Sequence, residues 1–175
     1  MEQSIEPEFA DANEIIQADQ KEPERLICAI DLDFAIKSKS NFRRTKSAAH
    51  SKEWASQQGF ENSLAVLALR ARPRGWDMGE PGDKLSKRPG YVILIVARTT
   101  LDTANMAKSV TDALEGILFV NDASVRHVAC VSERARTAQS ATILVSPISA
   151  SAPISEVLAL AQWLGEKYAA RAEAD

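Results

Sequence analysis

Residues 91–125 read YVILIVARTTLDTANMAKSVTDALEGILFVNDASV, and this stretch decides the fold. It opens with a continuous apolar run that ends at Arg98, which predicts a central strand covered on both faces. A helix is predicted to follow as far as about Leu118, capped by Asp102 or a preceding threonine. Its apolar residues recur at helical spacing and are Met106, Val110, Ala113, Leu114 and Ile117. Asn121 and Asp122 then predict a turn, because such side chains hydrogen-bond their own backbone.

The sequence before this stretch predicts one strand, one helix and a long connection. From Leu26 the run LICAIDLDFAI has strand length, with Asp31 and Asp33 on one face. A helix is predicted over residues 51–69. Its apolar stripe contains Trp54, Leu64 and Leu67. Residues 71–90 hold several glycines and prolines and predict a long connection, a type of segment that is commonly functional or disordered.

The sequence after this stretch predicts two strands and a terminal helix. Residues 125–134 and 141–146 are interpreted as the two strands of a hairpin, and Pro153 opens an amphipathic helix. The inward residues of that helix are Val157, Leu160, Ala161 and Leu164. The predicted order is therefore β-α-β-α-β-β-α, an α+β fold in which a mixed sheet is packed by helices.

Length and composition indicate one soluble globular domain. The 175 residues are enough for a single substantial core, and no stretch reaches the ~18 apolar residues of a membrane span. The acidic first residues, MEQSIEPEFADANE, lack the basic and apolar regions of a signal peptide. Cys28 and Cys130 lie in apolar runs without metal-ligand spacing and are expected to be buried free thiols. Together these features predict a cytoplasmic protein.

Charge is distributed unevenly along the chain. Residues 1–25 contain eight acids and two bases, so 19 bases and 16 acids remain in the rest. The first 25 residues also contain two prolines and few aromatic residues, which predicts an acidic disordered tail. The folded part is therefore mildly basic, and its local basic clusters say more about partners than the net charge does.

The helix predicted after the central strand carries a recognisable pattern. It resembles the signature of the RusA family of Holliday-junction resolvases, the crossover junction endodeoxyribonucleases. In that signature an Asp-x-Asp-Asn-x-x-Lys run opens a helix that continues to Asp-Ala-Leu, and an acidic pair precedes the next strand. Asp102, Asn105 and Lys108 match the first run, residues 112–114 match Asp-Ala-Leu, and Asp122 matches the second acid of the pair.

The resemblance extends over about 120 residues and implies a division of the chain. The predicted organisation is an acidic tail over residues 1–25, a RusA-like domain over 26–148 and a C-terminal amphipathic helix over 149–175. Two positions depart from the family pattern. Ala104 stands where the family has its second aspartate, and Asn121 stands where an acidic residue is usual.

The resemblance also implies a metal and a set of site residues. In the family the carboxylates bind Mg²⁺, which implies Mg²⁺ here, with Mn²⁺ as a possible substitute. The implied metal ligands are Asp102 and Asp122. The implied catalytic residues are Asp102, Asn105, Lys108 and Asp122. Asp102 and Asp122 are therefore expected to lie near each other in one cleft, and Asp31 or Asp33 could offset the carboxylate missing at Ala104.

Such residues suit phosphodiester hydrolysis. A hard cation held by carboxylates can activate water, shield charge on the transition state and stabilise the leaving alkoxide. A lysine two turns into the helix could reach the scissile phosphate or the leaving oxygen. The simpler interpretations are that Asp102 only caps the helix, that Asp122 only forms a turn, and that Lys108 and Asp112 form a solvated pair.

A basic segment after the first strand predicts contact with DNA phosphates, because sequence-independent affinity comes from such clusters. Its basic residues are Lys37, Lys39, Arg43, Arg44, Lys46 and Lys52. Within it, SNFRR at residues 40–44 resembles the Ser/Asn-rich basic loop of the family. The alternative is a solvated loop. A second group that could extend this surface consists of Arg70, Arg72, Arg74, Lys84, Lys87 and Arg88.

The leading hypothesis is a Mg²⁺-dependent endonuclease that acts on branched or duplex DNA in recombination and repair. A homodimer is expected, because a four-way junction has near two-fold symmetry and needs two symmetric cuts. Two alternatives stay open. One is a catalytically inactive relative that keeps the fold and DNA binding, which Ala104 favours. The other is a structural or assembly protein without a nucleic-acid role.

Overall fold

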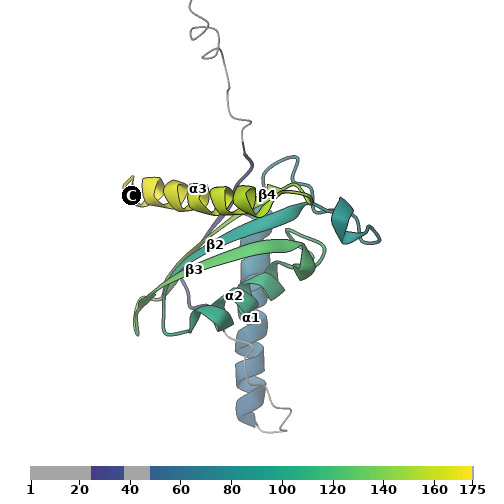
Figure 1. Ribbon diagram of the computed structural model, residues 1–175. Coiled ribbons are helices and arrows are strands. Elements are labelled where there is room, and N and C mark those ends of the chain that lie inside the picture. The colour runs from purple at the N-terminus through teal and green to yellow at the C-terminus, as the bar shows by residue number, and fades with distance from the viewer. Residues whose placement is uncertain (1–24, 38–47, 175) are drawn as a thin grey trace, which may run out of the picture.

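Three α-helices flank a mixed sheet in the computed structural model, which describes residues 25–37 and 48–174 (Figure 1). They are α1 (Ala48–Ala71), α2 (Thr103–Leu114) and α3 (Ile154–Ala172). With the strands, the order is β-α-β-α-β-β-α. Both the predicted order and the predicted α+β class are confirmed.

The sheet contains four strands within the described ranges, in the spatial order β1-β4-β2-β3. These are β1 (Cys28–Leu32), β2 (Gly90–Thr99), β3 (Val125–Arg134) and β4 (Ser140–Ile148). Strand β2 pairs with β3 in parallel, and β4 lies between β1 and β2, antiparallel to both.

The predicted hairpin of residues 125–134 and 141–146 is therefore wrong. Both strands exist, but they lie on opposite sides of β2 instead of pairing with each other. Burial gives the physical reason. Ile143, Leu144 and Val145 are all buried, so β4 is apolar on both faces and occupies an interior position. Most of β3 is half-buried or exposed, which suits a strand at the edge of the sheet.

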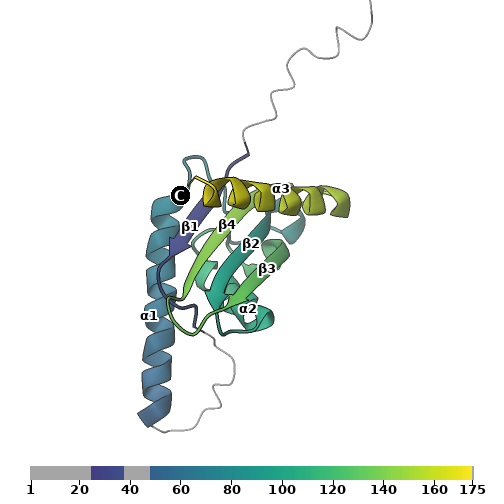
Figure 2. The same ribbon diagram turned by 90° about the vertical axis from the view of Figure 1, so that its left-hand side faces the viewer.

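Helices cover both faces of the sheet (Figure 2). Helices α1 and α2 pack on one face, where Ile93 and Ile95 of β2 belong to the larger core. Helix α3 packs on the other face, against Val92 and Leu94 of β2. Successive side chains of β2 thus point into different cores, as the period of two in a strand requires. The prediction that β2 is covered on both faces is confirmed.

Helix α1 buries a narrow apolar stripe. Phe60, Leu64 and Ala68 are buried at helical spacing, and Leu67 is partly buried in the same core. Trp54, which the sequence placed in this stripe, is 59% exposed. The first turns of α1 extend past the end of the sheet, so no described strand or helix lies opposite them (Figure 1). The stripe is therefore confirmed at Leu64 and Leu67 but wrong at Trp54.

The connection over residues 72–89 is packed against the domain. The Trp76 ring stacks on Tyr91, with ring centroids 5.9 Å apart, and its Nε1 donates a hydrogen bond to the Leu118 carbonyl at 2.7 Å. Arg72 Nη1 donates to the Ile117 carbonyl at 3.0 Å. The connection thus fixes the turn that follows α2.

The two cysteines are free thiols. Cys28 on β1 is fully buried, and this burial raises the pKa of its thiol to about 12. Cys130 on β3 is only partly buried, and its pKa is raised by the same effect. The expectation of a buried thiol is confirmed at Cys28.

In the described ranges, no helix combines the length and apolar character needed to cross a membrane.

The contrast between two leucines of α1 gives a test of this packing. Leu64 is 0% exposed, whereas Leu69 on the same helix is 50% exposed. Leu64→Ala should lower the free energy of unfolding by about 2–5 kcal/mol through lost burial and a cavity. Leu69→Ala, the matched control, should change it by less than about 0.5 kcal/mol. Urea denaturation measures both, and equal losses would contradict the packing of α1.

Candidate functional site

Asp102 begins helix α2 as its N-cap. Its Oδ1 accepts a hydrogen bond from the Asn105 backbone N–H at 2.8 Å, and its Oδ2 accepts one from Asn105 Nδ2 at 2.6 Å. These two hydrogen bonds hold the pKa of the exposed Asp102 carboxyl below its ordinary value. The helix therefore presents a charged carboxylate to solvent at neutral pH, in contact with the amide of Asn105.

Lys108 lies on the solvent side of α2, three residues after Asn105. Residues three apart on a helix are neighbours, so the lysine follows the Asp102–Asn105 pair along the helix surface. Lys108 Nζ lies 3.7 Å from Asp112 Oδ2, and the lysine side chain is 65% exposed. Because the lysine end of the pair is in solvent, the ion pair contributes little to the free energy of unfolding. Lys108 therefore remains available to an anionic ligand.

Asp122 lies in the turn between α2 and β3, as predicted. It is the first residue of the short 3-10 helix η2 (Asp122–Ser124), and it is exposed. Asn121 caps this helix, because its Oδ1 accepts a hydrogen bond from the Ala123 backbone N–H at 2.8 Å. Asn121, which departs from the family pattern, thus supports the turn that holds Asp122.

The structure separates Asp102 from Asp122 within one chain. Asp102 follows the last residues of β2, whereas Asp122 precedes the first residues of β3. These strands are parallel, so helix α2 carries the chain from one end of the sheet back to the other (Figure 1). The twelve residues of α2 rise by about 18 Å. In agreement, Phe119 packs on Tyr91 at the start of β2, with ring centroids 5.3 Å apart.

The expectation that Asp102 and Asp122 share one cleft is therefore wrong for a single chain. The nineteen residues between them contain a crossover between parallel strands, and such a crossover leads from one end of the sheet to the other. Within the described ranges, no group of three or more His, Cys, Asp or Glu residues is placed to hold a metal ion. The assignment of each aspartate as a metal ligand stays a prediction.

Asp31 does not replace the carboxylate that is missing at Ala104. Asp31 Oδ2 accepts a hydrogen bond from Arg171 Nη2 of α3 at 2.7 Å, and its Oδ1 accepts one from Thr142 at 2.9 Å. The contact with α3 places Asp31 on the sheet face opposite to α2. Ala104 itself is exposed in the first turn of α2, so its side chain fills no core space.

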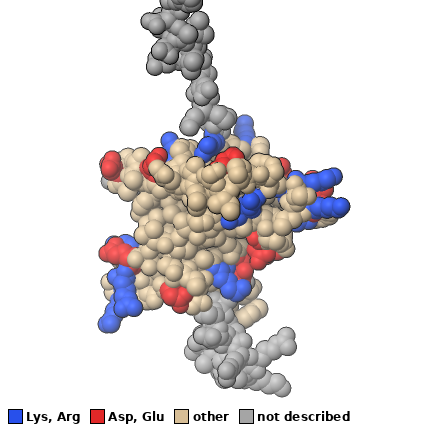
Figure 3. Space-filling view, viewed as in Figure 1, with Lys and Arg blue, Asp and Glu red and all other residues tan. Residues whose placement is uncertain are grey.

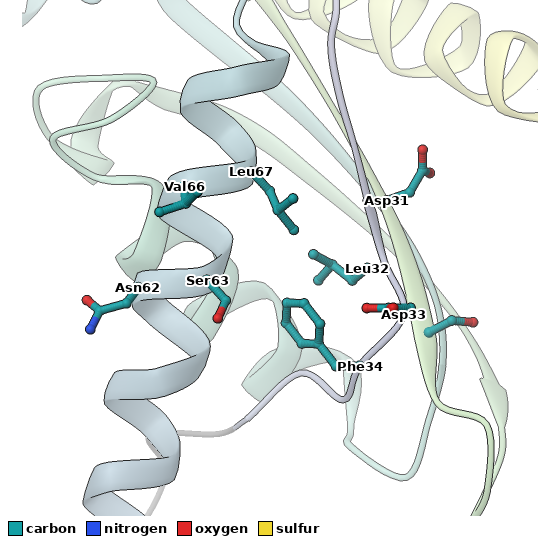
Figure 4. Close-up of a pocket in the computed structure, with 9 residues that line it drawn as sticks. Asp31, Leu32, Asp33, Phe34, Asn62, Ser63, Val66 and Leu67 are labelled. Carbon is teal, nitrogen blue, oxygen red and sulfur yellow. The ribbon is translucent and has the colours of Figure 1, made fainter.

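Asp33 lies in a different environment, at a groove of about 730 Å³ between β1 and α1. Figure 4 shows Leu32, Phe34 and Leu67 converging in this groove, while Asp31 points away from them. The lining residues are partly apolar and partly polar, and no basic side chain is among them. The groove therefore offers no cationic side chain to a DNA phosphate.

Most of the predicted DNA-binding segment lies outside the described residues. This applies to Lys39, Arg43, Arg44 and Lys46, and to the side chain of Lys52. Lys37 is described and exposed, and its role in DNA binding stays a prediction.

The second basic group is divided between two roles. Arg72 contacts the Ile117 carbonyl and supports the fold. Lys84 and Lys87 are exposed, and Lys and Arg side chains project at the side of the molecule where the 72–89 connection lies (Figure 3). Near Asp122 the structure adds two residues that sequence reasoning missed, Ser124 and Arg126. A serine in a turn and an arginine in a strand give no signal in the sequence alone.

The fold and the charged surface of α2 define a small α+β protein built around a parallel β-α-β crossover. A family model described as endodeoxyribonuclease RusA matches residues 12–145, most of the chain. The chain therefore belongs to the RusA endodeoxyribonuclease family, and the predicted resemblance is confirmed. The match begins before residue 26 and ends inside β4, so the predicted division of the chain into three segments stays a prediction.

Other comparisons add little. No curated protein matches the chain significantly. Among solved structures it is similar to CetZ from Methanosaeta thermophila strain DSM 6194, with 14% sequence identity and a TM-score of 0.25. The similarity covers 83% of this chain and 32% of that chain, so this chain spans about a third of the length of CetZ.

The cap at Asp102 gives a pH-dependent test. The pKa of the Asp102 carboxyl is lower in the folded state than in the unfolded state. The charged carboxylate therefore stabilises the folded protein above the unfolded-state pKa, and this stabilisation is lost as the pH falls through the folded-state pKa. Asp102→Ala should therefore destabilise the protein at pH 7, and the difference should shrink below about pH 4. Asp102→Asn, the matched control, can still accept the backbone hydrogen bond and should stay near wild-type stability. Thermal unfolding across pH measures this, and a pH-independent loss would contradict the cap.

Proposed function

We propose that this chain is a Mg²⁺-dependent endonuclease that cuts four-way junctions and other branched DNA as a homodimer. Family membership supports endonuclease chemistry, and the retained Asp102, Asn105, Lys108 and Asp122 support its survival here. The observation that carries the proposal is the first turn of α2, where a charged, exposed carboxylate is held by Asn105. A cationic side chain, Lys108, follows on the same helix.

The donor set fits a hard cation in chemistry, because Asp102 and Asp122 offer exposed carboxylate oxygens. Bound Mg²⁺ would activate water and stabilise negative charge on the phosphate. The residues of the chain have their own tasks. Asn105 Nδ2 donates to Asp102 and so fixes the orientation of this carboxylate. Lys108 can exchange its exposed contact with Asp112 for a DNA phosphate.

The separation of the two aspartates favours a dimer. A two-fold axis passing near the middle of α2 would set the N-terminal end of one helix beside the C-terminal end of the other. Asp102 of one protomer would then approach the partner subunit's Asp122. The same axis would generate two equivalent sites, which matches the near two-fold symmetry of a four-way junction.

A second candidate function is a catalytically inactive relative that binds branched DNA. The specific observation that favours it is Ala104, because the first turn of α2 carries one carboxylate fewer than the family pattern. The exposed position of Ala104 makes the two candidates separable, since a carboxylate can be restored there without disturbing the core.

Restoring this carboxylate is the direct test of catalysis. An acid in the first turn also suits the positive end of the helix dipole, so Ala104→Asp should fold normally. Mg²⁺ affinity should rise about tenfold, equivalent to about 1.4 kcal/mol, and cleavage of a labelled four-way junction should appear or increase. Calorimetric titration and a cleavage assay measure these effects. Ala104→Asn is the matched control, because it adds similar volume without charge and should change neither.

If Ala104→Asp folds but leaves Mg²⁺ binding and cleavage unchanged, the inactive DNA-binding relative is the better description. Asp102→Asn in the same background should abolish any cleavage, because it removes the charge of the ligand and keeps the helix cap.

Mixed dimers test the arrangement of the site. In the Ala104→Asp background, Asp102→Asn and Asp122→Asn should each abolish cleavage. A dimer of the two variants keeps one complete site if each site combines Asp102 of one protomer with the partner subunit's Asp122. Co-expression should therefore restore a single nick in a labelled junction. Mixed dimers that form, as shown by native mass spectrometry, but stay inactive would contradict a site shared between the two protomers.

A further inference from the structure

A small cavity lies beside the turn that holds Asp122. It has a volume of about 200 Å³ and is lined by residues 85–86 and 88–90, by η2 and the start of β3, and by Ala150 in the segment that follows β4. The side chains of Arg88, Ser124 and Arg126 line it. No acidic residue belongs to its lining, and Asp122 is not part of it.

Two polar atoms in this lining have no partner among the described residues. Ser124 is 1% exposed, and its buried Oγ makes no hydrogen bond. The Nε atom of Arg88 is also buried and makes none. Buried polar groups are nearly always paired in native proteins, because an unpaired one loses its hydration without compensation. Two lining residues that each carry such an atom point to a polar ligand at this cavity.

Both arginines are held in place by the fold. The stem of Arg88 lies against Gly79, where an added Cβ would stand 3.1 Å from Arg88 Cγ. The stem of Arg126 crosses Gly90, where an added Cβ would stand 2.7 Å from Arg126 Cγ. A guanidinium that is already positioned loses less conformational freedom when it binds a ligand.

The head of Arg126 is fixed as well, yet it keeps free donors. Its Nη1 donates to the Ala150 carbonyl, and its Nη2 donates to the Ala152 carbonyl at 3.2 Å. A guanidinium has five N–H donors, so these two hydrogen bonds leave others available.

This chemistry selects a small oxyanion. Guanidinium groups match the oxygens of phosphate, and a serine hydroxyl can donate to a third oxygen. A cavity of about 200 Å³ is smaller than the ~300–1,000 Å³ of sites for drug-sized molecules, so its size suits a small anion such as a phosphate group.

We propose that this cavity binds one backbone phosphate of the DNA strand, through Arg88, Ser124 and Arg126. The identity of the strand as ligand rests on the proposed function, whereas the phosphate chemistry rests on the cavity itself. Ser124 is two residues from Asp122, so the bound phosphate would lie next to Asp122. Phosphate contacts of this kind set the register of a protein on DNA. The cavity would thus fix the strand relative to Asp122.

The first arm of the test uses the full chain and inorganic phosphate without DNA. Phosphate should raise the Tm of the wild type above its value in chloride at equal ionic strength, because a ligand that binds the native state stabilises it. Arg88→Gln and Ser124→Ala should each lose this rise, measured against their own Tm in chloride. Ser124→Ala removes an unpaired hydroxyl and should keep normal stability, so it reports the ligand and not the fold. Lys87→Gln, the matched control, removes an exposed charge outside the lining and should keep the rise.

The second arm measures binding of a four-way junction that has no terminal phosphates. Arg88→Gln should weaken binding about tenfold, and Lys87→Gln clearly less, because only Arg88 makes a charge-assisted hydrogen bond to a fixed phosphate. A wild type that phosphate does not stabilise beyond chloride overturns the cavity as an anion site, whatever the DNA result.

Two further outcomes separate the sources of phosphate. In the first outcome, phosphate stabilises the wild type but not Arg88→Gln, and Arg88→Gln and Lys87→Gln bind DNA with equal affinity. This outcome rules out the DNA strand as the ligand, and free phosphate remains as the ligand of the cavity. A wild type that binds phosphate here but binds no DNA overturns both the strand assignment and the proposed function.

Discussion

The structure depends on strand β2, which is buried on both faces and paired along both edges. Nine of its residues are in register with β3 and nine with β4, and its side chains enter the cores under α1 and α2 and under α3. A strand in this position favours apolar side chains on both faces and backbone groups that are paired along both edges. Strand β4 therefore pairs with the second edge of β2, and the charged residues of the sheet stand on the edge strands β1 and β3 and near the end of β2.

The parallel pairing of β2 and β3 also decides where chemistry can occur. A parallel pair requires a crossover, and helix α2 is that crossover. The signature residues stand at its two ends, with Asp102 and Asn105 in the first turn and Asp122 past the last. In the proposed function these ends are two half sites that helix α2 holds apart, and a second chain related by a two-fold axis would bring unlike ends together.

Much of this was predictable from sequence, for identifiable reasons. Three predictions rest on residues that are close in sequence: the apolar run of β2, the helical spacing from Met106 to Leu114 and the cap at Asp102. Their structure depends little on the rest of the chain, so the sequence predicts it. The strand neighbours were not predictable, because a short connection between residues 134 and 140 suggests a hairpin and only the competition for β2 excludes it. The exposure of Trp54 depends on how far α1 extends past the sheet. The sequence of α1 alone does not give this length relative to the sheet, so the exposure was not predictable. Likewise, Ser124 and Arg126 meet Arg88 only because β3 starts beside the end of the 72–89 connection.

The buried thiol of Cys28 has a consequence for how the sheet opens. Its sulfur lies on β1, which among the described strands pairs with β4 alone, and its raised pKa of about 12 leaves almost no thiolate at neutral pH. Only the thiolate reacts with alkylating reagents, and here it is also shielded by α1, where Sγ lies 3.8 Å from the Ala68 carbonyl oxygen. Labelling of the native protein at this sulfur therefore requires β1 or α1 to detach, so the chain carries a natural reporter of how often this edge of the domain separates from the rest.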